Sequence, residues 1–230
     1  MNNHYKLSLM KRNLTFICLI VICSSILLSC KDDDGEKNNE FSNWKSRNEA
    51  FFESVRNTAI KEIRQARAQY QDNWADHCNW RAFQSYSLGQ GSTANSMDDT
   101  IYVKVIRSGN GSGCPLSTDS VRVFYAGRLM PSESYKDGMM FDHSGQSNVM
   151  NNIFDHQTGA PASFSVSGKV RGFATALQHM HIGDLWQIYI PYKLGYKESS
   201  SGSVPAYSTL VFDVELLQYA RAGNKLPQWN

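Results

Sequence analysis

Two stretches of the chain alternate apolar and polar positions with the two-residue period of a β-strand. Residues 121–129 (VRVFYAGRL) and 209–217 (TLVFDVELL) are rich in β-branched and aromatic residues and are flanked by turn formers. In the second stretch Asp213 and Glu215 fall on one face, and four apolar residues fall on the other: Leu210, Phe212, Val214 and Leu216. This pattern predicts a half-buried antiparallel strand.

The second half of the chain carries further short strand patterns and one helical pattern. Strands are predicted at residues 101–106, 139–142, 164–166 and 185–190. Residues 173–181 are predicted to form a helix that stops near Gly183, with one apolar face made by Phe173, Ala176, Leu177 and Met180. Several strands, a short helix and two more strands predict an α+β fold, an antiparallel β-sheet wrapped around one short α-helix.

A longer helix is predicted over residues 43–71, where apolar residues recur at three- and four-residue steps without Gly or Pro. Its opposite face is basic. Two interpretations remain open: the apolar stripe packs on the following domain, or its aromatic residues Trp44, Phe51 and Phe52 form a homodimer or client-binding surface. Residues 72–98 are predicted to be a connector whose large side chains dock on their neighbours, and 88–96 (LGQGSTANS) is typical of a loop.

Cys78 and Cys114 are the two cysteines of this folded part. They can pair in an oxidising compartment, but the sequence does not establish the geometry. Neither has neighbours typical of a nucleophile, and two cysteines do not make a zinc site. His179 and His181 are two positions apart on a predicted helix, so they do not share a face. We therefore expect no metal and no cofactor.

The first 29 residues have the pattern of an export signal. A basic segment precedes an apolar run of 15 residues, 14–28, which is short for a bilayer span of about 20. The run ends in LLSC, which resembles a bacterial lipobox and predicts lipidation of Cys30; a cleaved ordinary signal and an uncleaved anchor are the alternatives. Residues 30–42 form a polar, acidic tether, in which CKDDD resembles the surface-export tag of Bacteroidetes lipoproteins. We expect a cell-envelope protein, lipid-anchored at the outer membrane and facing either the periplasm or the surface.

The net charge of the chain does not change the predicted fold or location. All 21 acidic residues and all but three of the 23 Lys and Arg residues follow residue 29, so the chain from Cys30 onward carries a formal charge of −1. A nearly neutral chain does not have the basic footprint of a nucleic-acid-binding protein.

Six motifs in order give a specific resemblance: VRVFYAGRL, FD, P-x-x-F before VRGF, ALQHM-x-x-G, IPYKLGY and VPAYSTLVFDVELL. Together they resemble the FKBP-type peptidyl-prolyl cis-trans isomerases over about residues 99–219. The resemblance implies an isomerase domain at 99–222 and leaves 43–98 as an N-terminal extension and 223–230 as a tail. It implies catalytic roles for Tyr125, Asp142 and Tyr196, and a substrate-binding pocket lined by Phe141, Val170, Phe173, Val204 and Phe212.

The chemistry of such a pocket needs neither a nucleophile nor a metal, because no bond is made or cut. An X-Pro amide interconverts slowly since rotation breaks its resonance, and an apolar pocket that binds the twisted amide best lowers that barrier. The resemblance implies proline-containing polypeptide clients and binding of a rapamycin-class macrolide.

Several positions depart from the family pattern. The pocket floor, often Trp, is Phe173; Lys197 stands where Gly is common; and Ala162 stands where small members often have an aromatic residue. Residues 145–161 are longer than in minimal members and contain apolar residues that could cover the pocket or contact clients. Two functions are therefore expected: a prolyl isomerase for exported proteins, or an FKBP-fold chaperone or binding subunit of a surface lipoprotein complex that has lost most turnover.

Overall fold

The computed structural model describes residues 40–85, 99–144 and 154–229, which belong to one compact unit. The predicted signal, Cys30 and the acidic tether up to residue 39 lie outside the described residues, as do residues 86–98 and the first part of the 145–161 segment. Among the helices of the described part, none is both long and apolar enough to cross a membrane.

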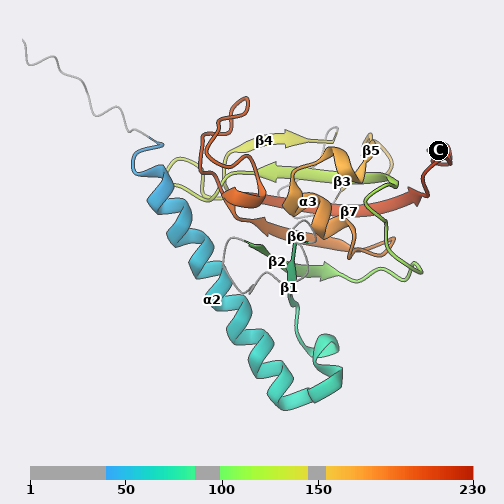
Figure 1. Ribbon diagram of the computed structural model, residues 1–230, viewed down its shortest axis with the longest axis horizontal. Coiled ribbons are helices and arrows are strands. Elements are labelled where there is room, and N and C mark those ends of the chain that lie inside the picture. Colours follow the sequence, from blue (N-terminus) through green and yellow to red (C-terminus); the bar gives the residue numbers. More distant parts are fainter. Residues whose placement is uncertain (1–39, 86–98, 145–153, 230) are drawn as a thin grey trace, which may run out of the picture. The chain divides into compact units, whose positions relative to one another are not determined.

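One antiparallel sheet organises the molecule (Figure 1). The strands run in the spatial order β1-β2-β6-β7-β3-β4, and β5 also pairs with β3. Their bounds are Trp80–Gln84 (β1), Thr100–Arg107 (β2), Ser120–Arg128 (β3), Met140–His143 (β4), Ala162–Ser165 (β5), Leu185–Ile190 (β6) and Leu210–Ala220 (β7). The short helix α3, Arg171–Leu177, packs against β1, β2 and β6. In the part of the chain that the structure describes, 3-10 turns cover Gln71–His77 (η1), Val166–Gly168 (η4) and Tyr192–Leu194 (η5). The predicted α+β class is confirmed.

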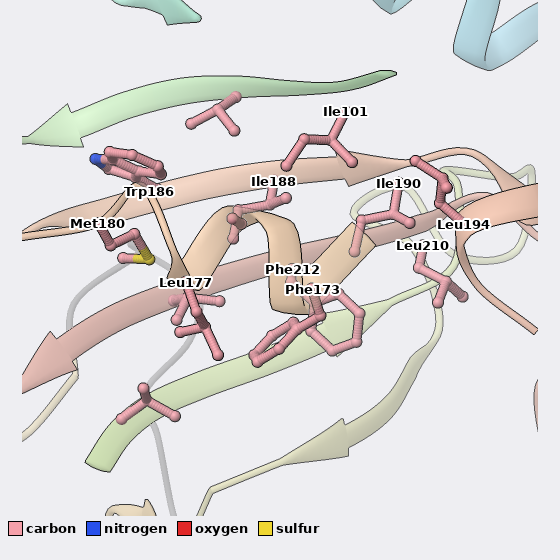
Figure 2. Packing of buried hydrophobic residues seen from close by; sticks show 14 of the residues in the cluster. Ile101, Phe173, Leu177, Met180, Trp186, Ile188, Ile190, Leu194, Leu210 and Phe212 are labelled. Carbon is pink, nitrogen blue, oxygen red and sulfur yellow. The ribbon is translucent and has the colours of Figure 1, made fainter. Parts of the chain in front are cut away.

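The core lies between α3 and the face of the sheet that we call the inner face. Alternate residues of β6 and β7 point to it, among them Ile188 and Phe212, and they meet Phe173 and Leu177 of α3 (Figure 2). Gly172 permits this close approach, because a Cβ there would lie 2.3 Å from Cγ2 of Ile190. The motif VRGF therefore needs its glycine for helix–sheet packing.

The long helix α2, Trp44–Tyr70, packs on the opposite, outer face of the sheet. The ring centroids of Phe52 and Tyr102 are 5.6 Å apart, and those of Phe51 and Tyr189 are 6.3 Å apart. The apolar stripe therefore packs within its own chain, as the first interpretation of this helix expects. Of the aromatic residues that suggested a dimer surface, Phe52 is buried in this packing and Trp44 is buried in the main core cluster.

The first turn of α2 is fastened to the loop that precedes β7. Trp44 Nε1 donates a hydrogen bond to Ser208 Oγ at 2.8 Å, and the backbone N–H of Thr209 donates to Asn48 Oδ1 at 2.7 Å. Asn48 is fully buried, and its Nδ2 donates to the carbonyl of Trp44 at 2.8 Å. The bonds to Ser208 and Thr209 connect positions more than 160 residues apart and fix the helix to the domain.

Two predictions about the sheet need correction. Residues 80–84 of the predicted connector form β1, a full strand paired with β2, so the sheet begins before residue 99. The acidic face of β7 is also covered: Asp213 is 0% and Glu215 3% exposed. Asp213 pairs with Arg128, and Glu215 pairs with Arg107 and His156, which is why two carboxylates can be buried there.

Candidate active site

The candidate site starts from the alternation of side chains along β3. Tyr125 and Gly127 point to the inner face, whereas Phe124 and Ala126 belong to a cluster on the outer face. Register places Gly127 opposite Asp142 of β4. The Tyr125 hydroxyl donates a hydrogen bond of 2.9 Å to Asp142 Oδ2. The tyrosine and the aspartate predicted from the motifs are therefore brought into direct contact.

Aromatic rings surround this pair on the inner face. Phe173 and Phe212 meet edge to face with centroids 4.9 Å apart, and Phe141 meets Phe212 at 5.4 Å. Tyr125 lies 6.2 Å from Phe173 and 6.3 Å from Phe212. Phe173 and Phe212 are 4% and 6% exposed, and Tyr125 and Phe141 are half-buried, so the cluster has a buried floor and partly exposed walls.

Gly127 makes room for the floor of the cluster. A Cβ at this position would lie 2.5 Å from Cε1 of Phe212 and 2.7 Å from Cζ of Phe141. Real Cβ atoms do not approach that closely, so any side chain here would push the two rings away. The glycine in VRVFYAGRL is therefore required by the aromatic packing.

Ser144 holds the backbone of Tyr125 where the sheet edge is interrupted. Strands β4 and β5 pair with different halves of the same edge of β3, and Tyr125 lies between the two pairings. The N–H of Tyr125 donates to Ser144 Oγ at 2.8 Å, and the N–H of Ser144 donates to the Tyr125 carbonyl at 2.9 Å. These bonds satisfy backbone groups that the ladder leaves without a strand partner and fix the direction of the Tyr125 side chain.

The other predicted site residues lie on segments around the cluster. Val170 immediately precedes α3, and Tyr196, which is half-buried, follows η5. Lys197 adopts a left-handed backbone with φ +60°, which explains why glycine suits this position. Val204 is 2% exposed and packs in the main core, so the structure gives it a packing role and its contact with substrate stays a prediction.

The environment keeps the phenol of Tyr125 neutral. Burial, followed by the hydrogen bond to Asp142 and the charge of that carboxylate, raises the pKa of Tyr125 well above its usual value. The Tyr125 hydroxyl is therefore a donor at every physiological pH, and one oxygen of Asp142 is occupied by it. The site offers fixed polarity beside aromatic rings, which suits binding and orientation.

Sequence reasoning missed Phe164, Ser144 and Gly127. Phe164 lies 6.0 Å from Phe173 and 6.3 Å from Tyr125, and Lys169 Nζ sits 4.1 Å from the centroid of its ring. The phenylalanine in P-x-x-F was visible in the sequence. Its role was not, because a single apolar residue in a short strand does not show which side it faces.

Phe154 of the long segment does not lie over the cluster. It is buried on the outer face, where its ring stacks on Phe124 at 5.5 Å, and His156 pairs with Glu215 at 2.9 Å. Of the two roles expected for apolar residues of the 145–161 segment, covering the pocket does not apply to Phe154, and contact with clients stays a prediction. Residues 145–153 lie outside the described residues.

Cys78, Cys114, His179 and His181, which the sequence singled out, are not part of the aromatic cluster. Cys78 is buried under α2 and Cys114 is partly exposed, and both are free thiols. His179 stacks on Phe83 with centroids 4.0 Å apart, while His181 Nε2 lies 3.6 Å from Cys114 Sγ. Cys114 thus has a histidine neighbour that the sequence did not indicate, but burial and nearby Asp184 raise the pKa of its thiol.

Comparison with known proteins agrees with this geometry. The family described as FKBP-type peptidyl-prolyl cis-trans isomerase matches residues 112–217. The chain is similar to the FKBP-type 22 kDa peptidyl-prolyl cis-trans isomerase of Escherichia coli (39% identity over 54% of this chain and 52% of the relative). It is also similar to the macrophage infectivity potentiator of Trypanosoma cruzi (31%, over 62% and 64%) and to the outer membrane protein MIP of Legionella longbeachae (32%, over 52% and 44%).

The structure places a sheet wrapped on one short helix, with aromatic rings and a Tyr–Asp pair between them, in the region that the family matches. Residues 112–217, just under half of the chain, are thus similar to the FKBP-type peptidyl-prolyl cis-trans isomerase family. The chain spans between 44% and 64% of the length of these three relatives.

Proposed function

We propose that this protein is a peptidyl-prolyl cis-trans isomerase that acts on exported polypeptides. The observation that carries the proposal is the Tyr125–Asp142 hydrogen bond beside the aromatic floor of Phe173 and Phe212. The similarity of residues 112–217 to the isomerase family supports it.

The apolar floor accounts for the first part of the catalysis. A proline ring has no N–H to satisfy and fits against aromatic rings, and its transfer removes the adjacent amide from water. Water stabilises the planar, charge-separated amide better than the twisted one, so its removal lowers the rotational barrier. The floor lies beneath half-buried Tyr125 and Phe141, which form the walls that hold the ring.

Fixed polar groups account for the second part. Asp142, oriented by Tyr125, faces the carbonyl that precedes the proline as that group turns out of the amide plane. The backbone N–H of Val170, which precedes helix α3, and the hydroxyl of Tyr196 bind substrate carbonyls on either side. Groups that are already oriented need no reorganisation as the amide twists, so they favour the transition state over both planar isomers.

The test is acceleration of a refolding reaction limited by proline isomerisation, measured with the compact unit from residue 40. Wild type should accelerate refolding at catalytic concentrations, and Asp142→Ala and Phe173→Ala should each lower the second-order rate constant severalfold or more. Circular dichroism must show that both variants stay folded. If wild type gives no acceleration over buffer, the catalytic proposal is wrong.

The same assay separates the second candidate function, an FKBP-fold chaperone or binding subunit with little turnover. The observation that favours it is the floor residue itself, because Phe173 offers less area than tryptophan and lacks its indole N–H. Suppression of client aggregation without any acceleration of refolding would favour the chaperone or binding function over the isomerase. Binding of a rapamycin-class macrolide, abolished in Phe173→Ala, would show that the aromatic site accepts ligands in either case.

We propose a lipid-anchored location in the cell envelope, on the sequence of residues 14–30. Metabolic labelling with a palmitate analogue should modify wild type and spare Cys30→Ser, and the variant should leave the membrane fraction. Labelling of both proteins, or of neither, would contradict lipidation at Cys30.

A further inference from the structure

A groove lies on the outer face of the sheet, away from the aromatic site. Helix α2 forms one wall with Phe51 and Val55, and the β3–β4 loop and the start of β4 form the other with Pro131 and Met140. The groove has a cavity volume of about 470 Å³. We call it the α2 groove.

Three of the strands that floor or border the α2 groove, β3, β4 and β7, also carry a residue of the candidate active site. Arg128 of β3 follows Gly127, Val211 of β7 precedes Phe212, and Met140 of β4 precedes Phe141. Because neighbouring residues of a strand point to opposite faces, the two sites lie back to back on the same strands.

The floor of the α2 groove is polar but carries no net charge. Arg128 Nη2 lies 2.7 Å from Asp213 Oδ2, with side chains 10% and 0% exposed. Gln187 Nε2 donates to Asp213 Oδ1 at 3.0 Å, and the Tyr189 hydroxyl donates to Gln187 Oε1 at 2.5 Å. The rim pair Lys136 and Asp137 also cancels in charge. A charged occupant would have to displace one of these balanced groups, so the chemistry favours an uncharged ligand.

The floor retains hydrogen-bonding capacity of both kinds. A carboxamide has two N–H donors and two acceptor lone pairs, and the side-chain bonds of Gln187 to the described residues use one of each. The Tyr189 oxygen can also accept a bond. A peptide backbone, which presents one donor and one acceptor per residue, needs this mixture.

The free capacity of these groups is concentrated at one point of the floor. Gln187 and Tyr189 are two positions apart on the outer face of β6, and the Tyr189 hydroxyl lies 2.5 Å from Gln187 Oε1, so their polar ends meet. One peptide unit of an extended segment that lies along β6 can bond to this pair. Its side chains would meet the apolar surfaces of Phe51, Val55 and Val211.

We propose that the α2 groove is a second polypeptide-binding site, which takes an extended, uncharged, apolar segment and does not require proline. A client bound here raises the effective concentration of its prolines at the aromatic site. Binding at the groove does not depend on catalysis, so its test can fail or succeed independently of the isomerase proposal.

The test uses ¹³C-methyl methionine NMR of the unit from residue 40, titrated with a capped, proline-free peptide of sequence GSVLFTSG. The methyl of Met140 borders the groove and is exposed, whereas that of Met180 is buried in the core and serves as the internal reference. We expect a saturable shift of Met140 with Met180 unchanged. Absence of saturable shift up to millimolar peptide would overturn the proposal.

Substitutions locate the binding. Val55→Trp fills the α2 groove from the helix side and should reduce the affinity tenfold or more, whereas Asn57→Trp, on an exposed position of the same helix, should leave it unchanged. Gln187→Leu removes the amide and should lower affinity severalfold, which keeps the test open if Val55→Trp fails to fold. Asp142→Ala should leave the Met140 titration intact. Loss of the shift in Asp142→Ala, or its persistence in both Val55→Trp and Gln187→Leu, would place the peptide elsewhere and contradict the proposal.

Discussion

Tyr125 and Asp142 are joined by a hydrogen bond of 2.9 Å across two adjacent strands, with the tyrosine as donor. Neither residue is unusual for a β-strand or a strand end. Their contact depends on the β3–β4 register, which sets Gly127 opposite Asp142 and leaves the gap at Tyr125 that Ser144 fills. The polarity of the site is thus a consequence of strand pairing, and it can be altered through residues that do not touch substrate.

Gly127→Ala tests the packing of the aromatic floor. The new methyl would lie 2.5 Å from a ring carbon of Phe212 and 2.7 Å from one of Phe141, so the rings must move. We expect stability to fall by about 1–3 kcal/mol, the usual cost of overpacking, and isomerase activity to fall tenfold or more. Denaturant unfolding and a refolding assay measure the two effects; an unchanged activity would show that ring placement is not critical.

Ser144→Ala tests the support of the interrupted edge. The change removes the acceptor of the Tyr125 N–H at a position where Ser144 is buried, so about 1–3 kcal/mol of stability should be lost. Activity should fall severalfold because Tyr125 loses its fixed direction. Ser163→Ala, on an exposed position of β5, is the matched control and should change stability by less than about 0.5 kcal/mol. Equal effects of the two changes would refute the supporting role of Ser144.

Asn48→Ala tests the attachment of α2 to the domain. It leaves the buried N–H of Thr209 without its acceptor and removes the side-chain donor to the carbonyl of Trp44. We expect a loss of about 2–4 kcal/mol in the free energy of unfolding, since two buried bonds are lost. Asn57→Ala, exposed on the same helix, is the control. Equal thermal midpoints for Asn48→Ala and Asn57→Ala would mean that these bonds do not hold the helix.

Tyr189→Phe tests the pH dependence of stability. Burial, and then the charge of Asp213, raise the pKa of Tyr189 to about 12 from its usual value of 10.0. The unfolded chain therefore releases this proton first as pH rises, so the stability that the neutral phenol supplies is full below pH 10 and is lost between about pH 10 and 12. This loss of stability at high pH, at most about 2 kcal/mol, should be absent in Tyr189→Phe. An identical stability–pH curve for wild type and variant would contradict the assignment.

Much of the fold could be predicted from the sequence because its strands are strongly patterned. Residues 185–190 form β6 as predicted, and 121–129 and 209–217 correspond to β3 and β7 with shifts of one to three residues. The strand at 80–84 was missed. Its burial alternates only weakly, and its partner β2 begins only at Thr100, so the local sequence pattern gives no sign of the pairing.

The outer face shows the limit of single-strand patterns. Asp213 and Glu215 alternate as solvent-facing residues do, yet α2 and residues 154–156 come from distant parts of the chain to cover that side of the sheet. These buried carboxylates are stabilised by ion pairs with Arg128, Arg107 and His156. No local pattern in the sequence indicates those pairs. The site residues could be predicted more readily, because each of them has a fixed position in the ordered series of motifs. Gly127 and Ser144 were missed because their roles exist only in the assembled register.

The central claim is that the aromatic cluster with Asp142 catalyses prolyl isomerisation. Two-dimensional exchange NMR on a short X-Pro peptide measures this directly, because the rate of cis–trans exchange is read at equilibrium. We predict that substoichiometric protein from residue 40 raises the exchange rate well above the uncatalysed rate, that Asp142→Ala lowers the enhancement severalfold or more, and that Phe173→Ala nearly removes it. Exchange no faster than in buffer, or an equal enhancement in wild type and Phe173→Ala, would contradict the claim.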